Sequence, residues 1–366
     1  MLELKTALRD YLDQEALNAE PNLFANFVTE DDAKFYLPFT KGWDQLSGIL
    51  ENKLAEYNDT FAQMNLVLFN QAMEHLCRIS RIIESPGGHG LLVGVGGSGK
   101  QSLSKLSAFA SSYSTYQLVI SATYSVTDLK TDLQAMYRRC GIKGEGMAFI
   151  FTDQQIADER FLVYMNDLLS SGNIPGLFPA EDQDDIINAV RPLVKRAGML
   201  DTRDNCWDYF IQEVRANLHV ILCFSPIGDP IRVRARRFPS LVNCVVIDWF
   251  QPWPEEALIS VAQRFLADVP MATDELRENV SHHMAYVHES VETMTEAYLA
   301  QERRNVYTTP KSYLDLIGLY TEKLGILQGE VDDKRERMNV GVAKLVETNA
   351  IVDDLKADLT KLEPIL

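Results

Sequence analysis

A glycine-rich segment in the first third of the chain has the residue types and spacing of a phosphate-binding loop. The segment reads Gly94-Val95-Gly96-Gly97-Ser98-Gly99-Lys100-Gln101-Ser102. Its glycines let several backbone N–H groups turn toward anionic oxygens, and Lys100 supplies a cation for the β- and γ-phosphates. An apolar run precedes it at 89–93 and a helical pattern follows at 102–109, the setting that separates such a loop from a chance glycine cluster. The sequence therefore predicts a nucleotide site, with a glycine turn that binds nothing as the alternative.

The residues expected on the metal side of this site depart from the usual pattern. Gln101 stands where the loop normally has Ser or Thr, whose hydroxyl binds Mg²⁺. Its amide oxygen is carried on a longer arm, which puts metal affinity and geometry in question. Asp153 ends the apolar run 146–152 and is the predicted metal-side carboxylate. The alternative is that Asp153 only ends a core strand.

The position that often carries the catalytic base is also changed. Many hydrolysing P-loop proteins have a glutamate directly after the acid at Asp153, and this chain has Gln154 and then Gln155. A neutral amide orients water but cannot take its proton, and losing a positioned general base typically costs about 10²- to 10⁴-fold in rate. We therefore predict nucleotide binding with little or no hydrolysis. Two alternatives stay open: an active ATPase that uses Asp158 or Glu159, and an empty structural scaffold.

Composition narrows the class of protein. The chain has 366 residues and a formal net charge of −17, with 52 acidic against 35 basic residues, which argues against a general binder of nucleic acid or of a membrane surface. The five cysteines are scattered without paired spacing, as expected of reduced thiols in the cytosol. No apolar run of about 18 residues and no signal-peptide layout occur. We expect a soluble cytoplasmic chain without nucleic-acid or membrane partners.

Alternating patterns predict the elements that position the loop and the acid. The predicted strands are 90–95, 116–121, 147–152, 218–224 and 242–249, and the predicted helices between them include 100–110, 125–139 and 158–170. Strands separated by helices of this length favour an α/β fold with a parallel sheet and helices on both faces. Ligands of such sheets bind beyond the carboxyl ends of the strands, where the loop and Asp153 are both expected.

The last part of the chain is predicted to be wholly helical and to carry an apolar seven-residue repeat. The repeat consists of Val331, Met338, Leu345, Val352, Leu359 and Leu366, with Leu355 and Leu362 at the matching d positions. Charged clusters occupy the other faces, so we expect this helix to project and to pair with a partner helix. An amphipathic helix lying on the body of the domain is the alternative.

Several long segments, in the same order, resemble the fourth AAA+ module of axonemal dynein heavy chains. They are GVGGSGKQSL at 94–103, FIFTDQQ at 149–155, NDLLSSGNIPGLF at 166–178, LHVILCFSPIGD at 218–229 and RARRFPSLVNCVVIDWFQPWPEEAL at 234–258. The resemblance implies an AAA+ P-loop large subdomain with a parallel sheet at 86–250, after an N-terminal helical segment at 1–85. It further implies a small helical lid at 251–315 and a projecting coiled-coil helix at 316–366, the start of the microtubule-binding stalk.

The resemblance assigns further residues to the nucleotide site. The residues that would cover the adenine are Leu66, Val67, Leu68 and Phe69. Ser225 falls on the sensor position after the fourth strand, and Lys311 falls where the lid contributes a cation to the phosphates. For each of these the alternative is a structural role, as core, strand end or helix start.

The resemblance also implies cofactors, partners and a location. Arg236 or Arg237 would reach the nucleotide of an adjacent module, with a surface cluster paired to local acids as the alternative. The implied cofactor is ADP or ATP with Mg²⁺. The implied partners are adjacent AAA+ modules of the same heavy chain, a second stalk helix, the microtubule through the stalk tip, and dynein light and intermediate chains. We expect a regulatory module in the cytoskeleton of the ciliary or flagellar axoneme that couples ring conformation to the stalk.

Overall fold

The computed structural model describes residues 23–28, 36–39 and 42–362 of the chain. The predicted repeat position Leu366 and residues 1–22 of the predicted N-terminal segment lie outside these ranges. The chain divides into two compact units. One runs to Ser260 and includes Thr309–Lys311, and the other comprises Val261–Thr308 and Ser312 onward. Across the described ranges, no helix is both long enough and apolar enough to cross a lipid bilayer.

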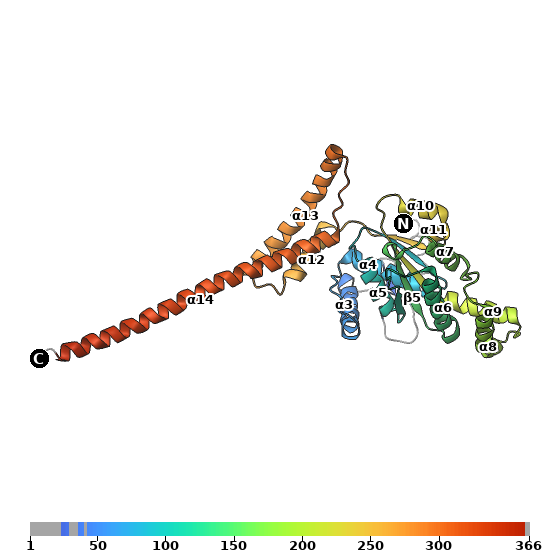
Figure 1. Cartoon of the computed structure of the whole chain (residues 1–366), viewed down its shortest axis with the longest axis horizontal. Helices are drawn as coiled ribbons and strands as arrows, with labels where there is room; N and C mark the ends of the chain where they lie inside the picture. Colours follow the sequence, from blue (N-terminus) through green and yellow to red (C-terminus); the bar gives the residue numbers. More distant parts are fainter. Residues whose placement is uncertain (1–22, 29–35, 40–41, 363–366) are drawn as a thin grey trace, which may run out of the picture. The chain divides into compact units, whose positions relative to one another are not determined.

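The first unit is built on a parallel sheet of five strands (Figure 1). The strands are β3 (Gly90–Val93), β4 (Ser114–Gln117), β5 (Met147–Thr152), β6 (Leu218–Phe224) and β7 (Val246–Trp249), in the order β4-β5-β6-β3-β7. Every residue of β3, β5 and β6 is buried, as expected for apolar strands covered on both faces. The predicted α/β fold with a parallel sheet is confirmed. A separate antiparallel pair joins β1 (Phe24–Ala25) to β2 (Leu37–Pro38).

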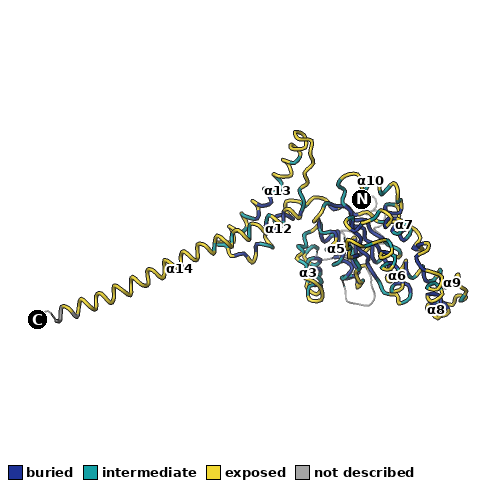
Figure 2. The backbone as a smooth tube through the Cα atoms, viewed as in Figure 1, coloured by how far each residue is buried: buried dark blue, intermediate teal, exposed yellow. Residues whose placement is uncertain are grey.

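Helices cover the sheet in two layers, each with its own core. They are α3 (Trp43–Thr60), α4 (Asn70–Glu84), α5 (Lys100–Ala110), α6 (Val126–Lys143), α7 (Phe161–Ser171), α8 (Ala180–Arg196), α9 (Arg203–Asn217), α10 (Pro230–Arg237) and α11 (Ser240–Asn243). Buried residues of α3–α5 belong to one apolar cluster and those of α6–α9 to another. Strand residues alternate between the two clusters: Met147 and Phe149 of β5 face the second, and Ala148 faces the first. The centre of the sheet, formed by β3, β5 and β6, is accordingly drawn as buried in Figure 2.

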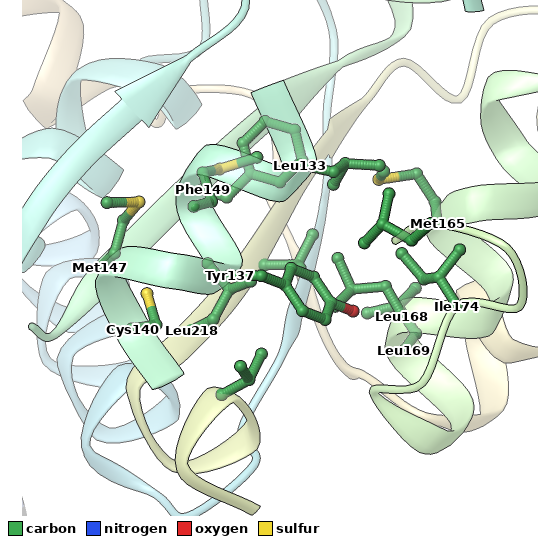
Figure 3. Packing of buried hydrophobic residues seen from close by; sticks show 14 of the residues in the cluster. Leu133, Tyr137, Cys140, Met147, Phe149, Met165, Leu168, Leu169, Ile174 and Leu218 are labelled. Carbon is green, nitrogen blue, oxygen red and sulfur yellow. The ribbon is translucent and has the colours of Figure 1, made fainter. Parts of the chain in front are cut away.

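Local signals set the bounds of these helices. Ser125 and Asp128 form a capping box at the start of α6, and Gly144 ends that helix in the left-handed conformation. Within the core, Tyr137 of α6 lies beside Leu168, Leu169 and Ile174 (Figure 3). Its hydroxyl donates a hydrogen bond of 2.7 Å to the carbonyl of Gly172, so the buried polar atom is satisfied.

Three predicted strands have other bounds in the structure. The strand predicted at 90–95 ends at Val93, because the glycine-rich loop begins at Gly94. The strand predicted at 116–121 pairs with β5 only as β4, Ser114–Gln117, because the next carbonyl, that of Leu118, accepts a hydrogen bond from the Gln155 side chain instead. The strand predicted at 242–249 begins at Val246, because residues 240–243 form α11 after Pro239, whose fixed φ favours a helix start.

The second unit is helical. It contains the end of α12 (Glu255–Leu266), all of α13 (Asp274–Glu302) and nearly all of α14 (Pro310–Leu362). Within it, the buried ring of Tyr313 contacts the ring of His288 edge-on, with 5.2 Å between the ring centroids. The side-chain amide of Gln328 donates a hydrogen bond to the carbonyl of Pro270.

The distal part of α14 exposes its apolar repeat. From residue 329 on, every described side chain of α14 is exposed (Figure 2). These exposed side chains include Val331, Met338, Leu345, Val352, Leu355 and Leu359 of the repeat. The predicted pairing of this helix with a partner helix stays a prediction.

Candidate functional site

The glycine-rich loop connects β3 to α5, as the sequence predicts. Gly97 has φ 80° and Gly99 has φ 87°, values in the left-handed region that favours glycine. Position 94 requires glycine because there is no room for a side chain: an added Cβ would lie 2.6 Å from Cβ of Phe250 and 3.0 Å from Oγ of Ser98. The backbone can therefore curl tightly beneath an anionic ligand, at the N-terminus of an eleven-residue helix.

Lys100 holds the loop from inside. Its ammonium group is buried and donates to the carbonyls of Gly94 (2.7 Å) and Val95 (2.8 Å) and to Oγ of Ser98 (3.0 Å). Burial lowers the pKa of Lys100, against the opposing influence of Cys223 and Asp153. The side chain thus fixes the curved backbone and places a cation at the centre of the loop.

A cleft of about 550 Å³ brings the loop together with the predicted acid and sensor residues. Besides the loop it is lined by Asp153, Gln154, Cys223, Ser225, Ile227 and Thr309. The cleft thus lies at the carboxyl ends of β3, β5 and β6, where ligands of parallel sheets bind, and its volume suits a nucleotide-sized molecule. The phosphate half of the predicted site therefore suits an anionic ligand: its glycines curl the backbone, Lys100 supplies a positive charge, and the cleft has room for the ligand.

The metal half fits less well. The amide oxygen of Gln101 accepts a hydrogen bond of 3.1 Å from Nε2 of Gln117, the last residue of β4. Oδ2 of Asp153 accepts one of 3.0 Å from the backbone N–H of Ser225. Mg²⁺ requires oxygen ligands in nearly octahedral geometry. The other carboxylate oxygen of Asp153, Oδ1, accepts no hydrogen bond from the described part of the chain.

The two adjacent glutamines have different environments. Gln154 is exposed and lines the cleft, as expected of a residue that would face the attacking water. Gln155 is buried: its Oε1 accepts from the backbone N–H of Thr152 at 2.8 Å, and its Nε2 donates to the carbonyl of Leu118 at 2.6 Å. Gln155 therefore ties the end of β5 to the segment after β4, and of the two glutamines Gln154 is the one that lines the cleft.

The carboxylates that could replace Gln154 are held by arginines. Asp158 forms an ion pair of 2.6 Å with Arg160, whose hydrogen bonds hold the pKa of Asp158 below its usual value and make it a weaker base. Glu159 pairs with Arg234 at 3.2 Å and with Arg237 at 3.5 Å. Neither acid lines the cleft. Over the described ranges there is also no group of three or more His, Cys, Asp or Glu residues arranged to hold a metal.

The predicted neighbour-facing arginines lie on α10. Arg236 is exposed and makes no ion pair within the described ranges, whereas Arg237 contacts Glu159. Arg234, on the same helix, was not among the predicted site residues. It lines a cavity of about 240 Å³ together with Asp153, Gln154 and Ser225. Its place in a basic run was the available signal, but only the fold shows that it is the arginine beside Gln154.

The residues predicted to cover the adenine do not line the phosphate cleft. Leu66 and Leu68 pack against the cluster of α3–α5. Val67 and Leu68 line a separate cavity of about 740 Å³ that includes Trp43 and Phe69, and neither lines the phosphate cleft. Their role at the nucleotide stays a prediction.

Lys311 contacts the loop through its backbone and Cβ. A Cβ added at Gly97 would lie 2.6 Å from Cβ of Lys311 and 2.8 Å from its backbone nitrogen. Lys311 therefore lies directly against the loop, at a glycine that leaves room for it. Ser225 is half-buried, and its Oγ accepts from the backbone N–H of Ile227 at 3.4 Å.

Comparison with known proteins gives a consistent result. A family model described as the P-loop containing dynein motor region D4 matches residues 64–323. The chain is 49% identical over 345 residues to the dynein beta chain of the flagellar outer arm of Chlamydomonas reinhardtii, which covers 93% of this chain and 8% of that protein. It is 48% identical over 352 residues to a ciliary dynein beta chain of Heliocidaris crassispina (96% of this chain, 8% of that protein). It is 49% identical over 350 residues to human dynein axonemal heavy chain 17 (96% of this chain, 8% of that protein). The chain thus spans about 8% of the length of these relatives.

Proposed function

Since the chain belongs to the family of P-loop dynein motor regions, we propose that it is the fourth AAA+ module of an axonemal dynein heavy chain and that it binds ADP or ATP with little or no hydrolysis. The proposed parts are an N-terminal segment (1–85), a large α/β subdomain (86–250), a lid (251–315) and a proximal stalk helix (316–366). The flagellar, ciliary and axonemal names of its relatives support a place in the axoneme.

One observation carries the proposal: a well-formed phosphate cradle beside an exposed glutamine. The loop and Lys100 offer an anion the donors and the charge that P-loops use. Gln154 reaches the same cleft but cannot remove a proton from water. The ion pairs of Asp158 and Glu159 disfavour the alternative in which one of these acids acts as the base.

The contact between Gly97 and Lys311 supports the proposed regulatory role. Phosphates bound on the loop would lie next to Lys311, a residue of the helix that continues to Leu362. A ligand shifts a conformational equilibrium only if it binds two arrangements with different affinity. We propose that the loop and Lys311 are the pair whose spacing the nucleotide sets, so that occupancy biases the stalk.

The proposed partners match exposed features of the chain. Arg236 is available to the nucleotide of an adjacent AAA+ module, where an arginine stabilises phosphate charge in trans. The apolar repeat of α14 suits a second stalk helix. Contacts with the microtubule through the stalk tip, and with dynein light and intermediate chains, are proposed for the whole heavy chain from the family alone.

A thermal-shift experiment tests nucleotide binding. A ligand that binds only the folded state stabilises it, by about 2.7 kcal/mol at a hundred times its dissociation constant. We expect ADP to raise the melting temperature of the chain and Lys100→Met to abolish the rise. Lys105→Met is the matched control, because Lys105 lies on the same helix but does not line the cleft. An unchanged melting temperature with saturating ADP would favour the empty scaffold.

A further inference from the structure

The residue at the usual metal-ligand position is bound to another side chain. Gln101 lies in the first turn of α5, and its Oε1 accepts the hydrogen bond from Nε2 of Gln117. Gln117 is fixed by the sheet: it is the last residue of β4 and lies in register with Ile150 of β5. The two amides therefore bridge the loop helix and the neighbouring strand end. The oxygen that would have to turn toward a cation is already engaged.

The second metal-side group is partly engaged as well. Asp153 follows β5 directly, and the N–H of Ser225, which follows β6, donates to its Oδ2. This leaves Oδ1 as the carboxylate oxygen of Asp153 that could face a hydrated cation. Mg²⁺ dehydrates reluctantly and gains protein affinity from well-placed oxygen ligands, usually hydroxyl or carboxylate. The protein would thus hold the metal of a Mg–nucleotide complex weakly.

The phosphate-side groups show the opposite pattern. Lys100 is buried in the loop, and the glycine conformations that shape the cradle do not depend on a metal ion. Phosphate oxygens would therefore meet the backbone N–H groups of a preformed loop and the positive charge of Lys100, whereas a metal ion would meet the amide oxygen of Gln101 and Oδ2 of Asp153, which already accept hydrogen bonds.

We infer that ADP binds this site almost independently of Mg²⁺, because Gln117 holds the amide oxygen of Gln101 and, in the described part of the chain, Oδ1 of Asp153 is the one oxygen of this pair without a hydrogen bond. This inference rests on the proposed nucleotide binding and deepens it. It assigns Gln117 a role that its position in the sequence, sixteen residues from Gln101, gives no reason to expect. Gln117 is a positioning residue, since it acts through Gln101.

Calorimetric titration of the chain with ADP, in Mg²⁺ and in EDTA, tests the inference. The ADP dissociation constant of the parent chain should differ by less than about threefold between the two buffers. Gln101→Ser restores a hydroxyl at the metal position, and its ADP affinity should increase about tenfold or more with Mg²⁺. Gln117→Leu removes the donor and frees the oxygen of Gln101, so it should raise the Mg²⁺ dependence above that of the parent.

Gln101→Leu is the matched control. It removes the amide without adding a hydroxyl, so it should stay as insensitive to Mg²⁺ as the parent chain. Gln101 is exposed and Gln117 is half-buried at the sheet edge, and melting temperatures of the variants without ADP check that each one folds.

The outcomes separate this inference from the proposed function. A parent chain whose ADP affinity rises about tenfold with Mg²⁺ overturns the inference and leaves nucleotide binding intact. A serine variant that stays insensitive to Mg²⁺ overturns the role given to Gln101. No detectable ADP binding in either buffer refutes the proposed function, and the inference with it.

Discussion

Replacing each of the two adjacent glutamines by leucine should separate a structural residue from a functional one. Gln155 is buried and makes two hydrogen bonds to the backbone, of 2.8 Å with Thr152 and 2.6 Å with Leu118. Gln155→Leu leaves a buried N–H and a buried carbonyl without these partners. Gln154→Leu changes an exposed side chain for which no hydrogen bond is found across the described ranges.

The magnitudes follow from these contacts. Each buried polar group left unsatisfied costs about 1–3 kcal/mol, so the two together cost about 2–6 kcal/mol. Burying a leucine in place of the amide offsets about 2 kcal/mol of this cost. We therefore expect Gln155→Leu to lower the free energy of unfolding by ~2 kcal/mol. For Gln154→Leu we expect a change within about 0.5 kcal/mol.

Urea unfolding followed by tryptophan fluorescence measures this difference in the unit that holds the site. All four tryptophans, at positions 43, 207, 249 and 253, lie in that unit. The midpoint of Gln155→Leu should fall well below that of the parent chain, and Gln154→Leu should unfold with the parent. Equal midpoints for the two variants would show that the hydrogen bonds of Gln155 do not hold the end of β5, and the distinction drawn here would be wrong.

Three further changes test other parts of the structure. Gly97→Ala should lower the free energy of unfolding by about 1–3 kcal/mol, since the φ of Gly97 is 80° and the new Cβ would lie 2.6 Å from Cβ of Lys311. Gly96→Ala is the control in the same urea assay, because a Cβ added at Gly96 would have no other part of the chain within 4 Å. Burial lowers the pKa of His89 to about 4, and its Nδ1 accepts from Val220, so stability present above the unfolded pKa of about 6.5 should be lost as pH falls toward 4. Urea titrations at pH values of about 6.5 and about 4 should show a smaller loss of stability for His89→Asn than for the parent chain. The same pH dependence in both proteins would contradict the role given to His89. Asp158→Asn should leave ATP turnover unchanged, and a severalfold fall would instead identify Asp158 as a base.

Local patterns in the sequence were enough to predict the framework. The loop, the helix 100–110 and the strands 147–152 and 218–224 were predicted with the bounds that the structure shows, because glycine spacing and buried apolar runs are properties of short segments. The sheet edge was less predictable. Periodicity marks 116–121 as apolar enough for a strand, but pairing ends at Gln117 because the carbonyl of Leu118 accepts a hydrogen bond from Gln155, 37 residues after Leu118.

Features that depend on distant pairs could not be predicted. The hydrogen bond between Gln101 and Gln117 joins residues 16 positions apart in the chain, and the ion pair between Arg234 and Glu159 joins residues 75 positions apart. In neither pair does the spacing along the sequence identify which residue will be the partner. The sequence therefore predicted the altered residue types at the site, whereas the environment that decides what each residue does became visible only in the fold.

The central claim is that the cleft holds nucleotide while its hydrolytic machinery is incomplete, and phosphate release from ATP tests it most directly. The parent chain should turn over more slowly than about 1 s⁻¹ in Mg²⁺, below the common range for enzymes. Gln154→Glu in a Gln101→Ser background restores both the base and the metal hydroxyl, and it should raise the rate by about 10²-fold or more. Turnover of about 1 s⁻¹ or faster in the parent chain, unchanged by these substitutions, would contradict the account.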